Sequence, residues 1–225
     1  RGDQPVGLAG GLDRLVDDLY EPWAKLIEAS DGNFYGSASG GKNYGGIYRM
    51  TPAGEVTVLH DMESLEGIHP NALVQASDGN LYGTARTGGA YDKGTLFRVG
   101  LDGTIEVLHS FRPRAEGEAP PAESLVEGDN GWFYGVLRDK GPRGGGSVFR
   151  AKATGKVEVL HAFGFDEDEG NGPWGLMRVP DGTFYGVTLE DYLAGQEWAR
   201  ENLADVRRSA GLNPDTGLPP EPTNG

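Results

Sequence analysis

The chain repeats one short pattern four times, and this repetition limits the folds that it can adopt. Each copy is an Asp-Gly or Asn-Gly pair followed by one variable residue, a large apolar residue, a tyrosine and a glycine, at residues 31–36, 78–83, 130–135 and 181–186. An aromatic–arginine pair follows the first three copies at 48–49, 97–98 and 149–150, and a Val-Leu-His block ends them at 58–60, 107–109 and 159–161. Three blocks in a fixed order indicate a tandem repeat of about 50 residues.

Each repeat predicts four short antiparallel strands. Asp-Gly and Asn-Gly suit a two-residue hairpin turn, and successive side chains of the strand that follows point to opposite faces of the sheet. Because both the apolar residue and the tyrosine are large, we expect both faces to be covered, with the core between sheets containing Tyr35, Tyr82, Tyr134 and Tyr185. Such sheets are typical of β-propeller blades. The fold expected is therefore all-β, with blades at about residues 26–62, 73–111 and 125–163.

The two ends of the repeat region predict a fourth, composite blade. The last repeat has only its first two strands, at residues 176–188, and residues 6–15 resemble residues 99–108, which span a turn and a fourth strand. We therefore expect residues 6–19 to complete the sheet begun by 176–188. The result would be a four-bladed propeller over residues 1–188, closed by pairing of the two chain ends. Closure of this kind removes exposed sheet edges.

The tail, residues 189–225, departs from the repeat. Apolar residues recur at helical spacing over about 189–210 and predict an amphipathic helix, whose apolar stripe includes Leu193, Leu203 and Val206. A proline-rich segment follows with Leu218, Pro219 and Pro220, and it is expected to be extended because proline fits neither a helix nor a central strand. We expect the tail to bind a partner chain; a strap over the protein's own fourth blade is the alternative.

These motifs resemble a known family. The order DGN-(F/L)-YG, Gly-rich loop, aromatic–Arg, VLH, and then a Glu-Gly element ending in proline at 66–70, 116–120 and 169–173 is similar to the tandem repeat named for Gloeobacter and Verrucomicrobia. The resemblance covers roughly residues 26–188. It implies a propeller-like, extracytoplasmic bacterial protein, and it brings no catalytic motif that could be carried over.

Composition excludes several partners. The formal net charge of −14 disfavours nucleic acid and anionic membrane surfaces, and the absence of cysteine excludes disulfides and thiolate metal sites. No stretch of the sequence is apolar enough for a transmembrane helix. The chain opens at Arg1 without an apolar leader, so either a signal peptide has been removed or the start is not shown. We expect a periplasmic or extracellular location.

Residues that could carry chemistry receive structural interpretations. The histidines and arginines recur once per blade, so they are not expected to converge on a metal, and the arginines are expected to pair with carboxylates. The acidic loop with Asp166 and Asp168 alternates carboxylates as a calcium loop does, but it lacks the distal bidentate glutamate; a solvated loop is expected and calcium is the alternative. No nucleophile elbow, zinc-protease or phosphate-loop motif is present. We therefore expect no enzymatic activity and no cofactor.

The loops that differ between blades are the expected binding region, since variable loops on a rigid scaffold usually carry binding. They contain basic and aromatic residues, the types enriched at interface hot spots: Tyr44, Tyr91, Lys93, Arg138, Lys140, Arg143 and Trp174. Ordinary surface variation is the alternative. The function predicted is a non-catalytic protein–protein interaction module or accessory subunit of a larger assembly, for which a membrane-associated assembly is one form. The alternative is a carbohydrate- or polymer-binding propeller with or without lyase or hydrolase activity.

Overall fold

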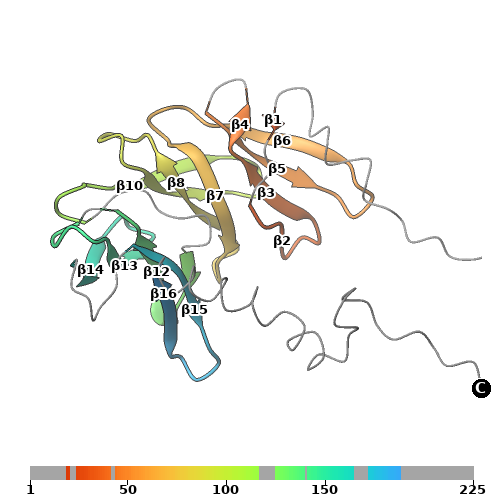
Figure 1. Ribbon diagram of the computed structural model, residues 1–225. Coiled ribbons are helices and arrows are strands. Elements are labelled where there is room, and N and C mark those ends of the chain that lie inside the picture. The colour runs from red at the N-terminus through yellow and green to blue at the C-terminus, as the bar shows by residue number, and fades with distance from the viewer. Residues whose placement is uncertain are drawn as a thin grey trace, which may run out of the picture.

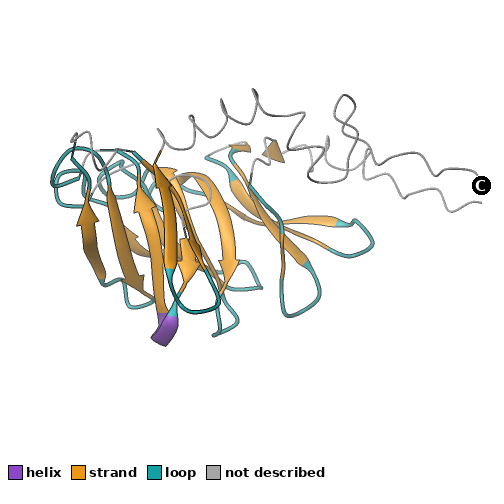
Figure 2. Ribbon diagram, turned by 60° about the horizontal axis from the view of Figure 1, so that its bottom comes forward, coloured by secondary structure: helices purple, strands orange, loops and turns teal. Residues whose placement is uncertain are grey.

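The computed structural model describes residues 19–20, 24–41, 44–116, 125–139, 141–164 and 172–188, and these residues form an all-β structure (Figure 1). Three antiparallel four-stranded sheets and one two-stranded sheet follow one another along the chain. We call these sheets blades one to four. Figure 2 shows their strands standing side by side, with the connecting loops gathered at the two ends.

The blades have the following strands. Blade one contains β2 (Ile27–Glu28), β3 (Phe34–Ala38), β5 (Gly46–Met50) and β6 (Val56–Asp61); blade two contains β7 (Ile68–Gln75), β8 (Leu81–Thr87), β9 (Thr95–Val99) and β10 (Ile105–Ser110). Blade three contains β11 (Leu125–Glu127), β12 (Trp132–Leu137), β13 (Ser147–Lys152) and β14 (Val157–Ala162), and blade four contains β15 (Pro173–Arg178) and β16 (Phe184–Thr188). A single 3₁₀ turn, η1 (Asp129–Gly131), precedes β12, and β1 (Leu19–Tyr20) pairs with β4 (Gly40–Gly41). The described part of the chain contains no α-helix.

The repeated Asp-Gly-Asn-x-Tyr signature forms a closed local unit. In blade two the Asp78 carboxylate accepts hydrogen bonds from the backbone and side-chain nitrogens of Asn80, and a third from the Tyr82 hydroxyl at 2.8 Å. Gly79 between them has φ 84°, in the left-handed region that favours glycine. Burial and the Asp78 carboxylate raise the pKa of Tyr82 to about 12. The motif therefore fixes the hairpin turn and anchors a buried tyrosine with the same carboxylate.

The glycines after Tyr35 and Tyr82 make room for an aromatic ring of the third strand of their own blade. A Cβ built on Gly83 would lie 2.7 Å from Phe97 Cζ and 2.8 Å from Leu73 Cδ2. Because Phe97 is fully buried, its ring cannot move away easily. The aromatic–arginine block is thus the partner of the Tyr-Gly block across the strand pair β8–β9.

The core lies between successive blades. Tyr35 of blade one shares a buried cluster with Leu81 of blade two, the Tyr82 ring stacks on Phe133 of blade three at 4.2 Å, and Tyr134 lies 4.3 Å from Phe184 of blade four. The prediction that these tyrosines pack between blades is therefore confirmed for the first three. It is wrong for Tyr185, whose side chain is 58% exposed, because no further blade follows it among the described strands.

The predicted closure of the propeller is not observed. Within the described residues β16 pairs only with β15, while Leu19 and Tyr20 pair with Gly41 and Gly40 beside blade one (Figure 1). The sequence pattern indicated that the N-terminal residues form a strand, but a strand pattern does not specify which sheet edge the strand joins, and for residues 19–20 that edge is β4. Residues 6–18 of the composite blade and the predicted helix and extended tail at 189–225 lie outside the described residues.

Candidate functional site

We call the described loops between second and third strands, together with the described connections between blades, the loop rim. The loops between the second and third strands of blades two and three contact the connections to neighbouring blades: Gly89 N donates to Ser64 O at 2.8 Å, Gly141 N to Pro113 O at 2.9 Å, and Gly172 N to Gly145 O at 2.9 Å. These backbone bonds tie the variable loops to the scaffold. The rim is therefore a fixed surface that carries side chains of variable type.

Aromatic side chains on the rim are held by guanidinium groups from neighbouring loops. Arg112, in the connection after blade two, lies 5.7 Å from the centre of the Tyr91 ring, and Arg138 of blade three lies 5.6 Å from the Trp174 ring. Both distances lie within the range of cation–π attraction. Tyr91 is 50% exposed. The rim therefore presents exposed aromatic surface beside a cation at Tyr91, whereas Trp174, in strand β15, is partly buried.

The other predicted rim residues are distributed along the same loops. Tyr44 is exposed, and its carbonyl oxygen accepts a hydrogen bond from His69 N at 2.9 Å. Arg143 donates to Ala162 O at 3.4 Å, and Lys93 is partly buried in the loop that carries Tyr91. Lys140 and the tail residues predicted to contact a partner lie outside the described residues, as do Asp166 and Asp168 of the calcium alternative.

The recurring histidines fasten the rim connections. His60 Nε2 lies 2.7 Å from Glu66 Oε2, and His109 Nε2 lies 2.8 Å from Glu116 Oε2, so each pairs with the glutamate of the Glu-Gly element. Glu116 also accepts a bond from Arg112 N, next to the cation that holds Tyr91. Burial by itself raises the pKa of Glu116, but the bonds from His109 and Arg112 outweigh it and lower this pKa below its ordinary value. The sequence assigned these histidines a structural role without identifying the glutamate as their partner.

The recurring arginines pair with carboxylates, as predicted, in two blades. Arg98 pairs with Glu106, and Arg150 Nη2 lies 2.6 Å from Glu158 Oε2. Both pairs join the third strand to the fourth strand of the same blade. They are therefore local cross-strand contacts.

The innermost strands of all four blades line a central cavity of about 250 Å³. Its lining from β7, β11 and β15 is aliphatic, with Leu73, Val126 and Leu176 among the residues, and Lys25 before β2 contributes the one titratable side chain of this lining. Across the described residues no three His, Cys, Asp or Glu side chains come close enough to hold a metal ion. This cavity offers apolar surface, without an acid–base pair.

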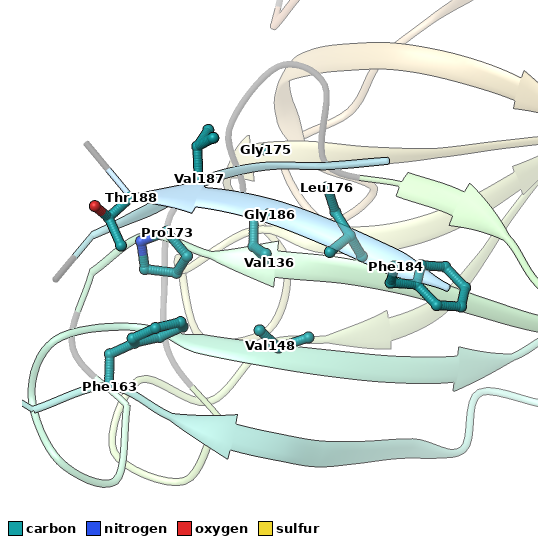
Figure 3. Close-up of a pocket in the computed structure, with 10 residues that line it drawn as sticks. All are labelled: Val136, Val148, Phe163, Pro173, Gly175, Leu176, Phe184, Gly186, Val187 and Thr188. Carbon is teal, nitrogen blue, oxygen red and sulfur yellow. The ribbon is translucent and has the colours of Figure 1, made fainter. Parts of the chain in front are cut away.

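A second cavity, of about 430 Å³, lies between blades three and four. Figure 3 shows Val148 and Phe163 of blade three on one side, and Leu176 and Phe184 of blade four on the other. At the preceding junction the corresponding space holds the third-strand ring Phe149, in edge contact with Phe111 at 5.1 Å. Blade four has no third strand among its described residues, so this space is open. The sequence signal for this opening is the missing aromatic–arginine block after Gly186, which led instead to the prediction of a composite blade.

No helix in the described part of the chain has the length and apolar character needed to cross a membrane.

Successive four-stranded antiparallel sheets packed face to face define a β-propeller-like protein. The chain belongs to the Gloeobacter/Verrucomicrobia repeat family, whose pattern matches residues 21–196. No curated protein matches the sequence.

Solved structures with a similar fold share little sequence identity with the chain. A catalytically inactive virginiamycin B lyase from Staphylococcus aureus, in complex with quinupristin, is 16% identical with a TM-score of 0.53, over 77% of this chain and 53% of that one. The extracellular domain of a putative hybrid two-component system from B. thetaiotaomicron is 14% identical with a TM-score of 0.50, over 72% of this chain and 20% of that one. The chain thus spans about half the length of the lyase. At these identities the similarity shows the fold alone.

Proposed function

We propose that the chain is a non-catalytic β-propeller that binds another protein through its loop rim, as an accessory or structural subunit of a larger extracytoplasmic assembly. The observation that carries this proposal is the pairing of rim aromatics with cations, the exposed Tyr91 with Arg112 and the partly buried Trp174 with Arg138. Tyrosine, tryptophan and arginine are the residues that most often dominate binding energy at protein interfaces. A ring already oriented by a neighbouring guanidinium loses less conformational entropy on binding.

The charge of the chain indicates the kind of partner. The net charge of −14 favours a partner with a basic surface, because complementary potentials raise the association rate. The rim cations are local exceptions on this acidic chain, and they suit aromatic rings or single carboxylates on the partner. The tail, with its predicted amphipathic stripe and proline-rich segment, is proposed as a second contact with the same assembly.

The central cavity supports a non-catalytic role. Acid–base catalysis needs a titratable side chain within hydrogen-bond reach of the substrate, whereas the cavity lining is aliphatic apart from Lys25. The shifted pKa values of Tyr82 and Glu116 have local structural causes, the hairpin turn and the rim connection.

The test combines two rim substitutions with a matched control. The full chain carrying both Tyr91→Ala and Trp174→Ala is recovered from its native extract after mild cross-linking, and the co-recovered chains are quantified against the unmodified protein. The control is Leu160→Ala, which removes an exposed apolar side chain from β14, away from the rim loops. We expect the rim substitutions to reduce co-recovery at least tenfold and the control to leave it unchanged.

Two outcomes would overturn the proposal. One is co-recovery that is unaffected by the rim substitutions. The other is a purified chain that binds or cleaves soluble polysaccharide and loses this property with the same two substitutions, which would establish the carbohydrate-binding alternative.

A further inference from the structure

Blade four exposes an apolar face that is buried in the other blades. Met177, Tyr185 and Val187 are 59%, 58% and 45% exposed. Met177 pairs with Tyr185 across β15–β16, and Val187 lies two residues further along β16, so all three are on one face. Figure 3 shows Val187 on the side of β16 away from Val136 and Val148. The equivalent tyrosines of blades one and two, Tyr35 and Tyr82, have no exposed surface.

The junctions between the described blades indicate which kind of residue would cover this face. At each junction the tyrosine of one blade packs against the next blade, near the apolar residue that precedes that blade's own tyrosine. Tyr82 meets Phe133, and Tyr134 meets Phe184. By this rule Tyr185 requires the equivalent apolar residue of a following blade. Among the described blades, the one such residue without a preceding tyrosine is Phe34 of blade one.

We propose that the open face of blade four binds blade one of a second copy of this chain, with Tyr185 of one copy packed on Phe34 of its partner. Phe34 is partly buried, as is Phe184, whereas Leu81 and Phe133 at the equivalent positions are 0% and 2% exposed. A two-fold axis makes the arrangement reciprocal, so both ends of both copies are covered. The new junction would have the same chemistry as the three junctions within the chain.

Electrostatic repulsion opposes this dimer, because each chain has a formal net charge of −14. Salt screens this repulsion but not the apolar contact, so association should tighten as ionic strength rises.

The first experiment measures the mass of the purified chain by sedimentation velocity across protein and salt concentrations. We expect a species of twice the 24.0 kDa chain mass, strengthened by salt. Tyr185→Arg places a charge in the proposed junction and should weaken the dimer at least tenfold while the far-UV circular dichroism spectrum is retained. Leu65→Arg is the control, because Leu65 is 69% exposed on a rim connection outside the proposed junction. A chain that stays monomeric at all concentrations overturns the proposal.

The second experiment tests whether Tyr185 of one copy lies beside Phe34 of the other. Because the chain has no cysteine of its own, cross-linking occurs only at the introduced cysteines. Single variants Phe34→Cys and Tyr185→Cys are mixed and treated with a short thiol–thiol cross-linker. The proposal predicts a cross-linked dimer in the mixture and far less product from either variant alone. A dimer that persists in Tyr185→Arg, or that cross-links equally in each variant alone, contradicts this junction. Since only the chain itself is present, these results are independent of the rim substitutions that test the proposed function.

Discussion

At the scale of single residues, the polar residues of the repeated motifs form hydrogen bonds within their own blade or with the connection that follows it. The aspartate of the Asp-Gly turn binds the tyrosine four residues later, and the histidine that ends the fourth strand binds the glutamate of the following connection. Such repeated polar residues can be mistaken for a ligand site in a sequence. Here their partners lie within the same repeat, so their recurrence reflects the recurrence of a fold element.

The pair His109–Glu116 predicts a dependence of stability on pH. The pKa of Glu116 in the folded protein lies below its ordinary value of 4.5, so the unfolded chain binds this proton more readily. The stabilisation is therefore fully present above the unfolded pKa and is lost as the pH falls through the folded pKa. Glu116→Gln should cost about 1–2 kcal/mol at pH 7 and less at acidic pH, when measured by urea unfolding at several pH values.

The control for this measurement is Glu55→Gln, a substitution at an exposed glutamate. It should change neither the stability at pH 7 nor the shape of the pH profile. An equal loss of stability for Glu116→Gln at every pH would contradict the role assigned to the carboxylate.

At the scale of strands and blades, the glycine after each tyrosine has an effect that depends on whether its blade has a third strand. The Cβ of Gly83→Ala would lie under 3 Å from Phe97 and Leu73, and overpacking of a filled core should cost about 1–3 kcal/mol. At Gly186 the nearest atoms are Gly175 O at 3.2 Å and Leu176 Cδ1 at 3.5 Å, so Gly186→Ala should cost clearly less. Thermal unfolding of the two variants, at concentrations where the chain is monomeric, measures the difference; equal losses would mean that a strand covers Gly186.

Much of the arrangement of strands within the blades could be predicted from the sequence. The strands and their order within a blade follow from the hairpin signature and the two later blocks, because these determine turn position and side-chain alternation within about 50 residues of chain. The cavity beside Val148 and the exposed Tyr185 were not predicted. They depend on which segment lies beside β16, and contacts between distant segments leave no local periodic pattern.

At the scale of the whole molecule, the same physical rule that builds the blades explains where the structure stays open. Each blade packs against its neighbours through both of its faces, so an open row of blades leaves the outer face of each end blade without a neighbouring blade. The predicted closure by the chain's own ends applied this rule but placed Leu19 at the wrong edge, since Leu19 pairs with Gly41 beside blade one. The rim that we propose for binding is separate from this face, because rim loops and sheet faces lie on different sides of each blade.

The central claim is that blades pack through their tyrosines in one direction and that the described row ends, uncovered, at Tyr185. Comparing the unfolding free energies of Tyr82→Ala and Tyr185→Ala, at protein concentrations low enough to keep the chain monomeric, tests it most directly. Tyr82 stacks on Phe133 and is fully buried, so its truncation should cost about 3–5 kcal/mol, whereas truncation of the exposed Tyr185 should cost less than about 1 kcal/mol. Equal, large losses for the two variants would contradict the account, because they would mean that the chain covers the face of blade four by itself.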